Sequence, residues 1–352
     1  MPSMSAVTSP FGALAVIVDP TAGEGSVAAE LGAVERALER GGLEHRVQVA
    51  VAPGDGTSSE TLLKNADIAL YHAKTERTGG ARFFEPEMDA SAKARLSLEQ
   101  DLRQALVNGG FEIHYQPLVD LRTNEVSGCE ALLRWRHPQR GMVSPAEFIP
   151  IAEDTGLINE LGDWVLRMAC NEAATWPAHV RVAVNVSPVQ LKCETLALRI
   201  AGALADSGLA PCRLELEITE AVLIRDDDAA LAILHQLRAL GVRIALDDFG
   251  TGYSSLSYLQ RFPFDKIKID RCFITELGEP DGSSSIVQAV VNIAAARNMT
   301  TTAEGVETAA QREMLRSLGC TEMQGHLFSA ARPGPEVRRL LGAPAKAVAA
   351  VS

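Results

Sequence analysis

The sequence predicts an α/β protein whose main domain is a single barrel of alternating strands and helices. Over roughly 250 residues, short apolar runs typical of strands alternate with amphipathic stretches typical of helices. A parallel barrel gathers the carboxyl ends of its strands on one face, so polar residues at those ends are expected to meet. These residues are Gln116, Glu130, Asn185, Glu217, Asp247, Asp248, Lys268, Glu304 and Gln324.

The barrel is expected over residues 108–342. Its first two strands, at 111–119 and 126–135, have no helix between them, so the barrel opens irregularly. The later strands are expected at 181–187, 213–219, 242–250, 265–270, 300–306 and 322–328. The helices are expected at 146–154, 162–176, 189–208, 229–241, 254–261, 285–298, 309–319 and 335–342.

A smaller α/β segment is expected in front of the barrel, over residues 1–88. It contains strand patterns at 12–18 and 45–52 and helix patterns at 26–40 and 60–76. A helical linker is expected over 89–107, and the tail 343–352 is expected to be disordered because it has no packing pattern.

The composition is that of a globular protein and argues against general nucleic-acid binding. The chain has 352 residues, of which 47% are hydrophobic, and a formal net charge of -12. Proteins that bind nucleic acids in general neutralise phosphates with Lys and Arg. The six cysteines form no C-x-x-C pair, and no apolar stretch is long enough to span a membrane. We therefore expect a cytoplasmic protein, with membrane anchoring only through a further upstream segment.

The acidic strand ends predict a divalent metal site. Glu130, Glu217, Asp247, Asp248 and Glu304 cannot all lie ionised within a few Å of one another without cations. Their oxygen atoms, together with the Asn185 carboxamide, suit Mg²⁺ or Mn²⁺ better than zinc. Two such ions about 3.5–4 Å apart are suited to in-line displacement at phosphorus. Lys268 would then orient the attacking water or neutralise developing charge.

Simpler roles compete with these assignments. A single carboxylate at a strand end is most often solvated or caps a helix. Lys268 could instead pair with Asp265 or Asp270 near the same strand. The Gly-rich stretch 248–255 is expected to form a mobile loop over the site.

The same residues resemble the EAL-domain cyclic-di-GMP phosphodiesterases. Glu130-Ala131-Leu132, within CEALLRWRHP, is similar to the family signature, and the resemblance runs from about Arg95 to Leu341. It includes, in family order, HYQPLVD, FIPIAEDTGLI, NVSP, LELEITE, ALDDFGTGYSSL, KIKID, AEGVET and MQGHLF. The family usually has Q-G-Y where this chain has Gln324-Gly325-His326, and Ser is common where this chain has Ala221.

The resemblance implies a TIM-type (β/α)8 barrel that hydrolyses cyclic di-GMP to linear pGpG with two Mg²⁺ or Mn²⁺ ions. It assigns one metal to Glu130, Asn185, Glu217 and Asp247, the other to Asp247, Asp248 and Glu304, and the attacking water to Lys268. It further assigns substrate contacts to Gln116 and Arg134, the polar rim to Glu307 and Gln324, and the anchor of the loop after Asp248 to Glu220. Inhibition by Ca²⁺ and a homodimer through the barrel are also implied.

The segment before the linker resembles the C-terminal half of a GGDEF domain, most clearly over residues 53–88. No G-G-D-E-F string occurs, so the sequence excludes cyclase chemistry. Such a half-domain is expected to be partly disordered, to dock onto the barrel or to belong to a longer natural protein. An upstream sensory or partner protein is a further expectation. Two alternatives to catalysis stay open: a non-catalytic receptor that binds cyclic di-GMP, and an interaction module.

Overall fold

A computed structural model describes residues 4–8, 14–18, 47–51, 61, 64–65, 68, 82–83, 85–220, 228–250, 259, 261–277 and 283–342. The chain forms two compact units, Met1–Asp101 and Leu102–Ser352, which we describe separately. The predicted helix at 26–40, most of that at 60–76, most of that at 254–261, and the tail 343–352 lie outside the described residues.

The first unit contains a sheet of four short strands. β1 (Met4–Thr8) is antiparallel to β2 (Leu14–Val18), which pairs in parallel with β3 (Val47–Val51), and β3 pairs with β4 (Arg82–Phe83). The strands expected at 12–18 and 45–52 are confirmed, whereas β1 was not expected. Helix α3 (Pro86–Asn108) contains the expected linker.

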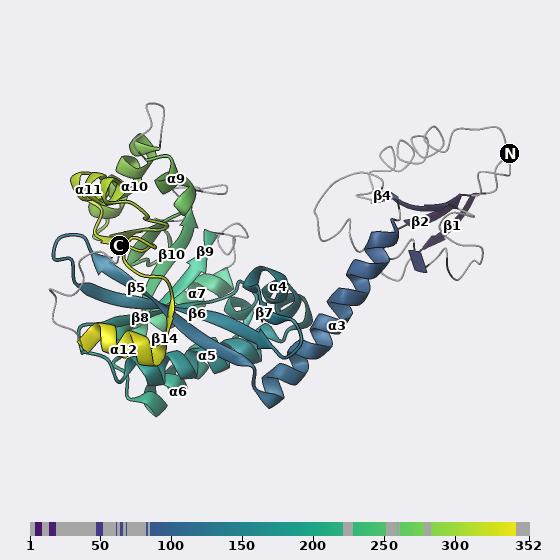
Figure 1. Ribbon diagram of the computed structural model, residues 1–352, viewed down its shortest axis with the longest axis horizontal. Helices are drawn as coiled ribbons and strands as arrows, with labels where there is room; N and C mark the ends of the chain where they lie inside the picture. Colours follow the sequence, from purple (N-terminus) through teal and green to yellow (C-terminus); the bar gives the residue numbers. More distant parts are fainter. Residues whose placement is uncertain are drawn as a thin grey trace. The chain divides into compact units, whose positions relative to one another are not determined.

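The second unit is a closed barrel, as the sequence predicted (Figure 1). Its strands are β5 (Phe111–Asp120), β6 (Val126–His137), β8 (Arg181–Asn185), β9 (Leu214–Thr219), β10 (Arg243–Phe249), β11 (Lys266–Ile269), β12 (Thr300–Ala303) and β13 (Glu322–Met323). Neighbouring strands from β6 through β8 to β13 are parallel. β5 closes the barrel by pairing antiparallel with both β6 and β13. Short strands β7 (Gly141–Val143) and β14 (Arg332–Pro333) pair antiparallel with β6 and β5, respectively.

A tight turn explains the irregular opening between β5 and β6. The Asp120 carboxylate accepts hydrogen bonds from the backbone N–H groups of Arg122 and Thr123, each at 2.8 Å. Asn124 adopts a left-handed conformation with φ 58°, which Asn tolerates better than most residues. The turn therefore joins the two strands directly, without the helix that a parallel connection requires.

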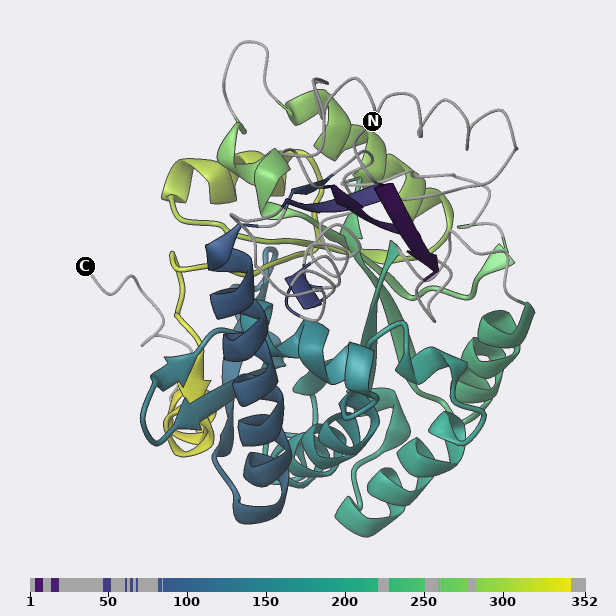
Figure 2. The same ribbon diagram turned by 90° about the vertical axis from the view of Figure 1, so that its right-hand side faces the viewer.

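Helices cover the outer side of the barrel (Figures 1 and 2). They are α4 (Pro145–Thr155), α5 (Ile158–Ala173), α6 (Leu196–Ser207), α7 (Asp228–Ala239), α9 (Arg271–Thr275), α10 (Ser284–Ala296), α11 (Ala309–Ser317) and α12 (Gly334–Gly342), with short 3-10 turns η2 (Gln190–Lys192) and η3 (Pro211–Arg213). The single helix expected at 189–208 is wrong, because η2 ends at Lys192, the next residue Cys193 has an extended backbone, and α6 begins only at Leu196. The short helix α9 was not expected.

The hydrophobic core lies between the strands and the helices. Val182, Leu216, Ile244 and Ile267 point outward from the strands and are fully buried there. Residues on the opposite side of the same strands face the barrel interior, and many of them are charged. Within the described ranges, no helix is both long and apolar enough to cross a membrane. The cytoplasmic location stays a prediction.

Candidate active site

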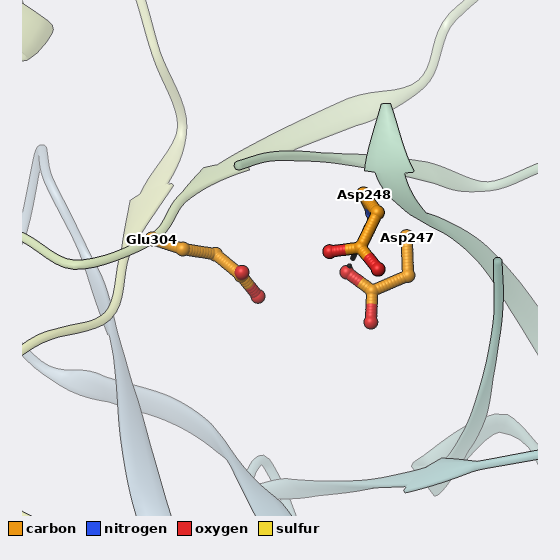
Figure 3. Close-up of side chains that lie close together, drawn as sticks. All are labelled: Asp247, Asp248 and Glu304. Carbon is orange, nitrogen blue, oxygen red and sulfur yellow. Dashed lines mark hydrogen bonds between the residues drawn. The ribbon is translucent and has the colours of Figure 1, made fainter. Parts of the chain in front are cut away.

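Three carboxylates meet at the carboxyl ends of β10 and β12. Oxygen atoms of Asp247, Asp248 and Glu304 all lie within 4.8 Å of one another, and Glu304 points across the barrel mouth toward the two aspartates (Figure 3). Asp248 has φ 54°, in the left-handed region, and its N–H donates to Asp247 Oδ1 at 2.9 Å. This local conformation brings the carboxylates of two consecutive residues to one site, although a regular strand would separate them.

Lys268 lies at the centre of the acidic residues. Its side chain is 1% exposed, and its Nζ lies 2.7 Å from Glu217 Oε2, 2.7 Å from Glu304 Oε1 and 3.1 Å from Asp247 Oδ1. Glu130 Oε2 is more distant, at 3.8 Å. One buried ammonium group thus connects carboxylates from four strands or strand ends.

The alternative partners of Lys268 are engaged elsewhere. Asp265 accepts the backbone N–H of Ile244 at 2.9 Å, and Asp270 caps helix α9 by accepting the N–H of Cys272 at 2.8 Å. The interpretation of Lys268 as a partner of Asp265 or Asp270 is therefore wrong.

Carboxamide groups hold Glu130 in place. Asn185 Nδ2 donates to Glu130 Oε1 and Gln324 Nε2 donates to Glu130 Oε2, both at 2.7 Å. Gln324 Nε2 also lies 3.1 Å from Gln116 Oε1. Glu130 and Gln116 are paired midway along β6 and β5, so the expectation that both end their strands is wrong. They reach the site because these two strands extend past it.

Burial and mutual repulsion shift the ionisation of the site. Burial raises the pKa of Glu304 to about 7, with the charges of Asp247 and Glu130 adding to the effect of burial and Lys268 opposing it. Burial likewise raises the pKa of Glu217 well above its usual range. For Lys268 burial acts downward, but the surrounding carboxylates outweigh it and hold its pKa well above the ordinary value. Lys268 is therefore an ammonium and a hydrogen-bond donor.

The donor set fits divalent cations. Four carboxylates lie within 4 Å of the buried Lys268 ammonium, and the Asp248 carboxylate lies beside two of them, so acidic groups outnumber the ammonium. Glu217 Oε1 is buried and, in the described part of the chain, has no hydrogen-bond partner. An orphaned carboxylate oxygen among other oxygen donors is what a hard cation would satisfy. The described residues thus contain an acidic cluster suited to metal binding, formed by Asp247, Asp248 and Glu304.

Two cavities adjoin the acidic residues. One, of about 390 Å³, is lined by Glu130, Asp247, Lys268, Glu304 and the predicted substrate and rim residues Gln116, Glu307 and Gln324. The other, of about 450 Å³, is largely apolar and is lined by Asn185 and the predicted substrate residue Arg134. Leu132 lines both cavities, so they are adjacent.

The predicted loop anchor, Glu220, lies directly after the end of β9. Glu220 is 5% exposed, and within the described residues its Oε2 has no hydrogen-bond partner. The loop that it is expected to anchor, 248–255, lies outside the described part from residue 251 onward. The anchoring role stays a prediction.

Several residues at the site were not predicted from the sequence. Arg271, Thr275 and His326 line the 390 Å³ cavity, and Glu153 and Ser187 line the apolar one. Ser187 Oγ donates to Glu153 Oε1 at 2.6 Å. Arg271 follows directly after KIKID, so its place after a strand end was the available signal.

Comparison with known proteins gives a consistent family match. The family model described as "EAL domain" matches residues 99–331. The bifunctional diguanylate cyclase/cyclic di-GMP phosphodiesterase MucR of Pseudomonas aeruginosa is 45% identical over 295 residues, covering 83% of this chain and 43% of that protein. The cyclic di-GMP phosphodiesterase PdeR of Escherichia coli is 41% identical over 294 residues, covering 83% of this chain and 44% of that protein. The chain thus spans less than half the length of these relatives.

A solved structure supports the same relationship. The structure titled "PaMucR Phosphodiesterase, c-di-GMP complex" is 46% identical, with a TM-score of 0.66, and covers 68% of this chain and 99% of that chain. The similarity therefore extends to the whole of that solved domain.

Proposed function

The chain belongs to the EAL domain family, and on that basis we propose that it hydrolyses cyclic di-GMP to linear pGpG. The observation that carries the proposal is the position of Lys268 among four carboxylates, beside a cavity large enough for part of a nucleotide. Phosphodiester cleavage needs charge stabilisation and a held water, and this arrangement offers both.

We propose that two Mg²⁺ or Mn²⁺ ions bind the acidic residues. One ion would be held by Glu130, Asn185, Glu217 and Asp247, and the other by Asp247, Asp248 and Glu304. The hydrogen bonds around Glu130 and the orphaned Glu217 oxygen support the first set, and the 4.8 Å cluster supports the second. We expect Ca²⁺ to inhibit, because it prefers longer bonds and more ligands than Mg²⁺.

In the proposed mechanism, the ions when bound would lower the pKa of a water and stabilise the leaving oxygen. Water adds to phosphorus as the P–O3′ bond breaks, and the proton that the water releases to solvent is balanced by the one that the leaving 3′ oxygen takes up, which leaves a 5′-phosphate and a 3′-hydroxyl. Lys268 would donate a hydrogen bond to the water in place of one of its three close carboxylate contacts. It does not accept the proton of the water, because its raised pKa keeps it protonated. Gln116 and Gln324, joined to Glu130, fix the floor of the substrate cavity.

The substrate is proposed to use both cavities. The 450 Å³ cavity is mostly apolar, as expected for one that buries a nucleobase. Arg134 lines this cavity, and among the described residues its guanidinium has one hydrogen bond, to the Leu133 carbonyl at 3.0 Å, so donors are left for a phosphate. Glu307 and Gln324 line the other cavity and would contact the second half of the dinucleotide.

A receptor that binds cyclic di-GMP without cutting it is the main alternative. Retention of every proposed metal ligand and of Lys268 favours the enzyme. Purified protein should be incubated with cyclic di-GMP and Mg²⁺ or Mn²⁺, and pGpG followed by chromatography, with a Ca²⁺ reaction and Glu130→Ala as controls. We expect the natural protein to form pGpG with Mg²⁺ or Mn²⁺, and we expect no pGpG from the Ca²⁺ reaction or from Glu130→Ala. Tight binding without product would establish the receptor, and normal turnover by Glu130→Ala would contradict the assigned site.

We also propose roles for the N-terminal segment, residues 1–88, and for the assembly of the protein. The match to MucR is longer than the EAL domain match, which supports assigning part of residues 1–88 to a truncated GGDEF-like segment. The predicted boundaries of the N-terminal segment at 88, of the linker at 107 and of the barrel at 342 stay predictions. We further propose a homodimer through the barrel, an upstream sensory or partner protein and a cytoplasmic location. Deletion of 1–88 followed by a partner pull-down tests the interaction-module role of that segment.

A further inference from the structure

A second group of charged side chains is buried inside the barrel, one layer below the candidate active site. We call Arg181, Glu215, Lys266 and Glu322 the lower charged layer. Lys266 is 1% exposed, and its Nζ lies 2.7 Å from Glu322 Oε2 and also contacts Glu215 Oε1. Arg181 lies 2.6 Å from Glu322 Oε1, and Arg243 lies 3.2 Å from Glu215 Oε2. These distances are typical of ion pairs, but the side chains occupy positions in the barrel interior that are usually filled by branched apolar residues.

Each member of the central pair is two residues away from a residue of the active site. Glu215 precedes Glu217 on β9, and Lys266 precedes Lys268 on β11. Side chains two residues apart on a strand project from the same face. The Glu215–Lys266 pair therefore repeats, one layer lower, the 2.7 Å pair between Glu217 and Lys268.

Both pairs connect strands that are not neighbours. Strand β10 lies between β9 and β11, and its Ala245 is paired in register with both Glu217 and Lys266. The methyl side chain of Ala245 leaves room for the two ion pairs to cross over β10. Two ion pairs, Glu217–Lys268 and Glu215–Lys266, thus fix how β9 and β11 are aligned along the strand direction.

We propose that Glu215 and Lys266 are positioning residues for the hydrolysis, which makes this inference rest on the proposed function. Their ion pair holds β9 and β11 in the alignment that keeps Glu217 Oε2 beside Lys268 Nζ, while Glu217 Oε1, which has no hydrogen-bond partner among the described residues, would be available to a metal ion. Neither residue lines either of the two cavities described above. A slip of either strand by a fraction of an ångström would move a metal ligand and the water-holding ammonium apart.

A purely stabilising role is the rival explanation, and it predicts a different result. Removing one member of a buried pair destabilises a protein, whereas replacing both members by apolar residues of similar size is often neutral. Stability alone therefore does not require the Glu215–Lys266 pair. The informative variant replaces both residues together, as Glu215→Leu with Lys266→Met.

The experiment compares kcat, KM for cyclic di-GMP, Mn²⁺ affinity by calorimetry and thermal unfolding among the natural protein, three variants and one further rescue variant. The three variants are the double variant, Glu215→Gln and the control Arg199→Met. Arg199 pairs with Asp163 at 2.8 Å on the outer helices, so its loss removes an ion pair that does not connect to the site. Lys266→Arg tests rescue by a residue of the same charge.

We expect the double variant to fold, with kcat lowered about tenfold or more, KM changed less than about threefold and Mn²⁺ affinity lowered. Glu215→Gln should show a smaller loss of the same kind, Lys266→Arg should retain more kcat than the double variant, and Arg199→Met should match the natural protein. Unchanged kcat and Mn²⁺ affinity in a folded double variant overturn the proposal. If that variant does not fold, unchanged values in Glu215→Gln overturn it. If the natural protein does not hydrolyse cyclic di-GMP, the proposed function fails. The comparison of Mn²⁺ affinity between the natural protein and the variants then decides whether Glu215 and Lys266 act as positioning residues.

Discussion

Lys268 Nζ lies 2.7 Å from Glu217 Oε2, and both side chains are almost completely buried inside the barrel. A fully buried Lys–Glu pair at the end of a cavity is costly unless other groups satisfy it. Here Glu304 and Asp247 complete the surroundings of the ammonium, while Glu217 Oε1 stays open. The pair thus joins the group that would hold the water to a group that would hold a metal.

Lys268→Met should remove turnover and make the protein depend on metal for stability. The ammonium neutralises part of the acidic cluster, so its loss leaves Glu217, Glu304 and Asp247 uncompensated. We expect kcat to fall by about a hundredfold or more. We also expect Mn²⁺ to raise the melting temperature of the variant more than that of the natural protein. Calorimetric scans with chelator and with Mn²⁺ measure this, and equal metal-induced shifts would contradict the electrostatic role.

Asp248→Asn and Asp248→Ala should separate backbone conformation from metal binding. Asp248 has φ 54°, a conformation that Asn adopts more readily than Ala. Both variants lose a carboxylate ligand and should lose most of their activity. Asp248→Ala should be less stable than Asp248→Asn by about 1 kcal/mol in denaturant unfolding. An Ala variant as stable as the Asn variant would show that the conformation relaxes.

Gly325→Ala should disturb the site through a backbone clash. A Cβ at Gly325 would lie 2.1 Å from the Val306 carbonyl oxygen, so the chain that carries Gln324 must move. We expect a folded but destabilised protein, by about 2 kcal/mol or more, with weakened substrate binding. Gly202→Ala is the matched control, because a Cβ there meets nothing within 4 Å and should stabilise α6. Equal unfolding free energies for the two variants would refute the predicted clash.

The contribution of Glu322 to the free energy of unfolding should decrease as the pH becomes acidic. Although burial opposes it, Lys266 and Arg181 lower the pKa of Glu322 to about 2, from an ordinary value of 4.5. A carboxyl with a lowered folded pKa stabilises the fold above its unfolded pKa and loses that effect as pH falls toward its folded pKa. Glu322→Gln should therefore be less stable at neutral pH by roughly 3 kcal/mol, and the difference should narrow as the pH falls from about 5 to about 2. Denaturant unfolding at several pH values tests this, and a constant difference would contradict it.

The barrel and the upper acidic cluster could be predicted because both follow from local patterns. Alternating strand and helix periods specify the barrel, and polar residues after apolar runs mark its mouth. Asp247, Asp248 and Glu304 meet as that rule requires. Glu130 meets them for another reason, because it lies midway along a long antiparallel hairpin whose register the sequence does not reveal.

The lower charged layer was missed, although the sequence contained a signal for it. In LELEIT and KIKID, charged residues alternate with apolar ones, which places Glu215 with Glu217 and Lys266 with Lys268 on one face. Alternation of this kind usually marks a solvent-exposed face. Only the closure of the barrel shows that this face is enclosed. The partners of Lys268 were misjudged for the same reason, since they come from other strands.

Hydrolysis in water enriched in the heavy oxygen isotope tests the central claim most directly. The protein is incubated with cyclic di-GMP in that water, with Mn²⁺ or with a chelator, and the pGpG is analysed by mass spectrometry. The account predicts one heavy oxygen atom on the 5′-phosphate of each pGpG formed with Mn²⁺, and no product with the chelator. Unlabelled linear product, or equal product in the presence of the chelator, would contradict a metal-dependent attack by water at this site.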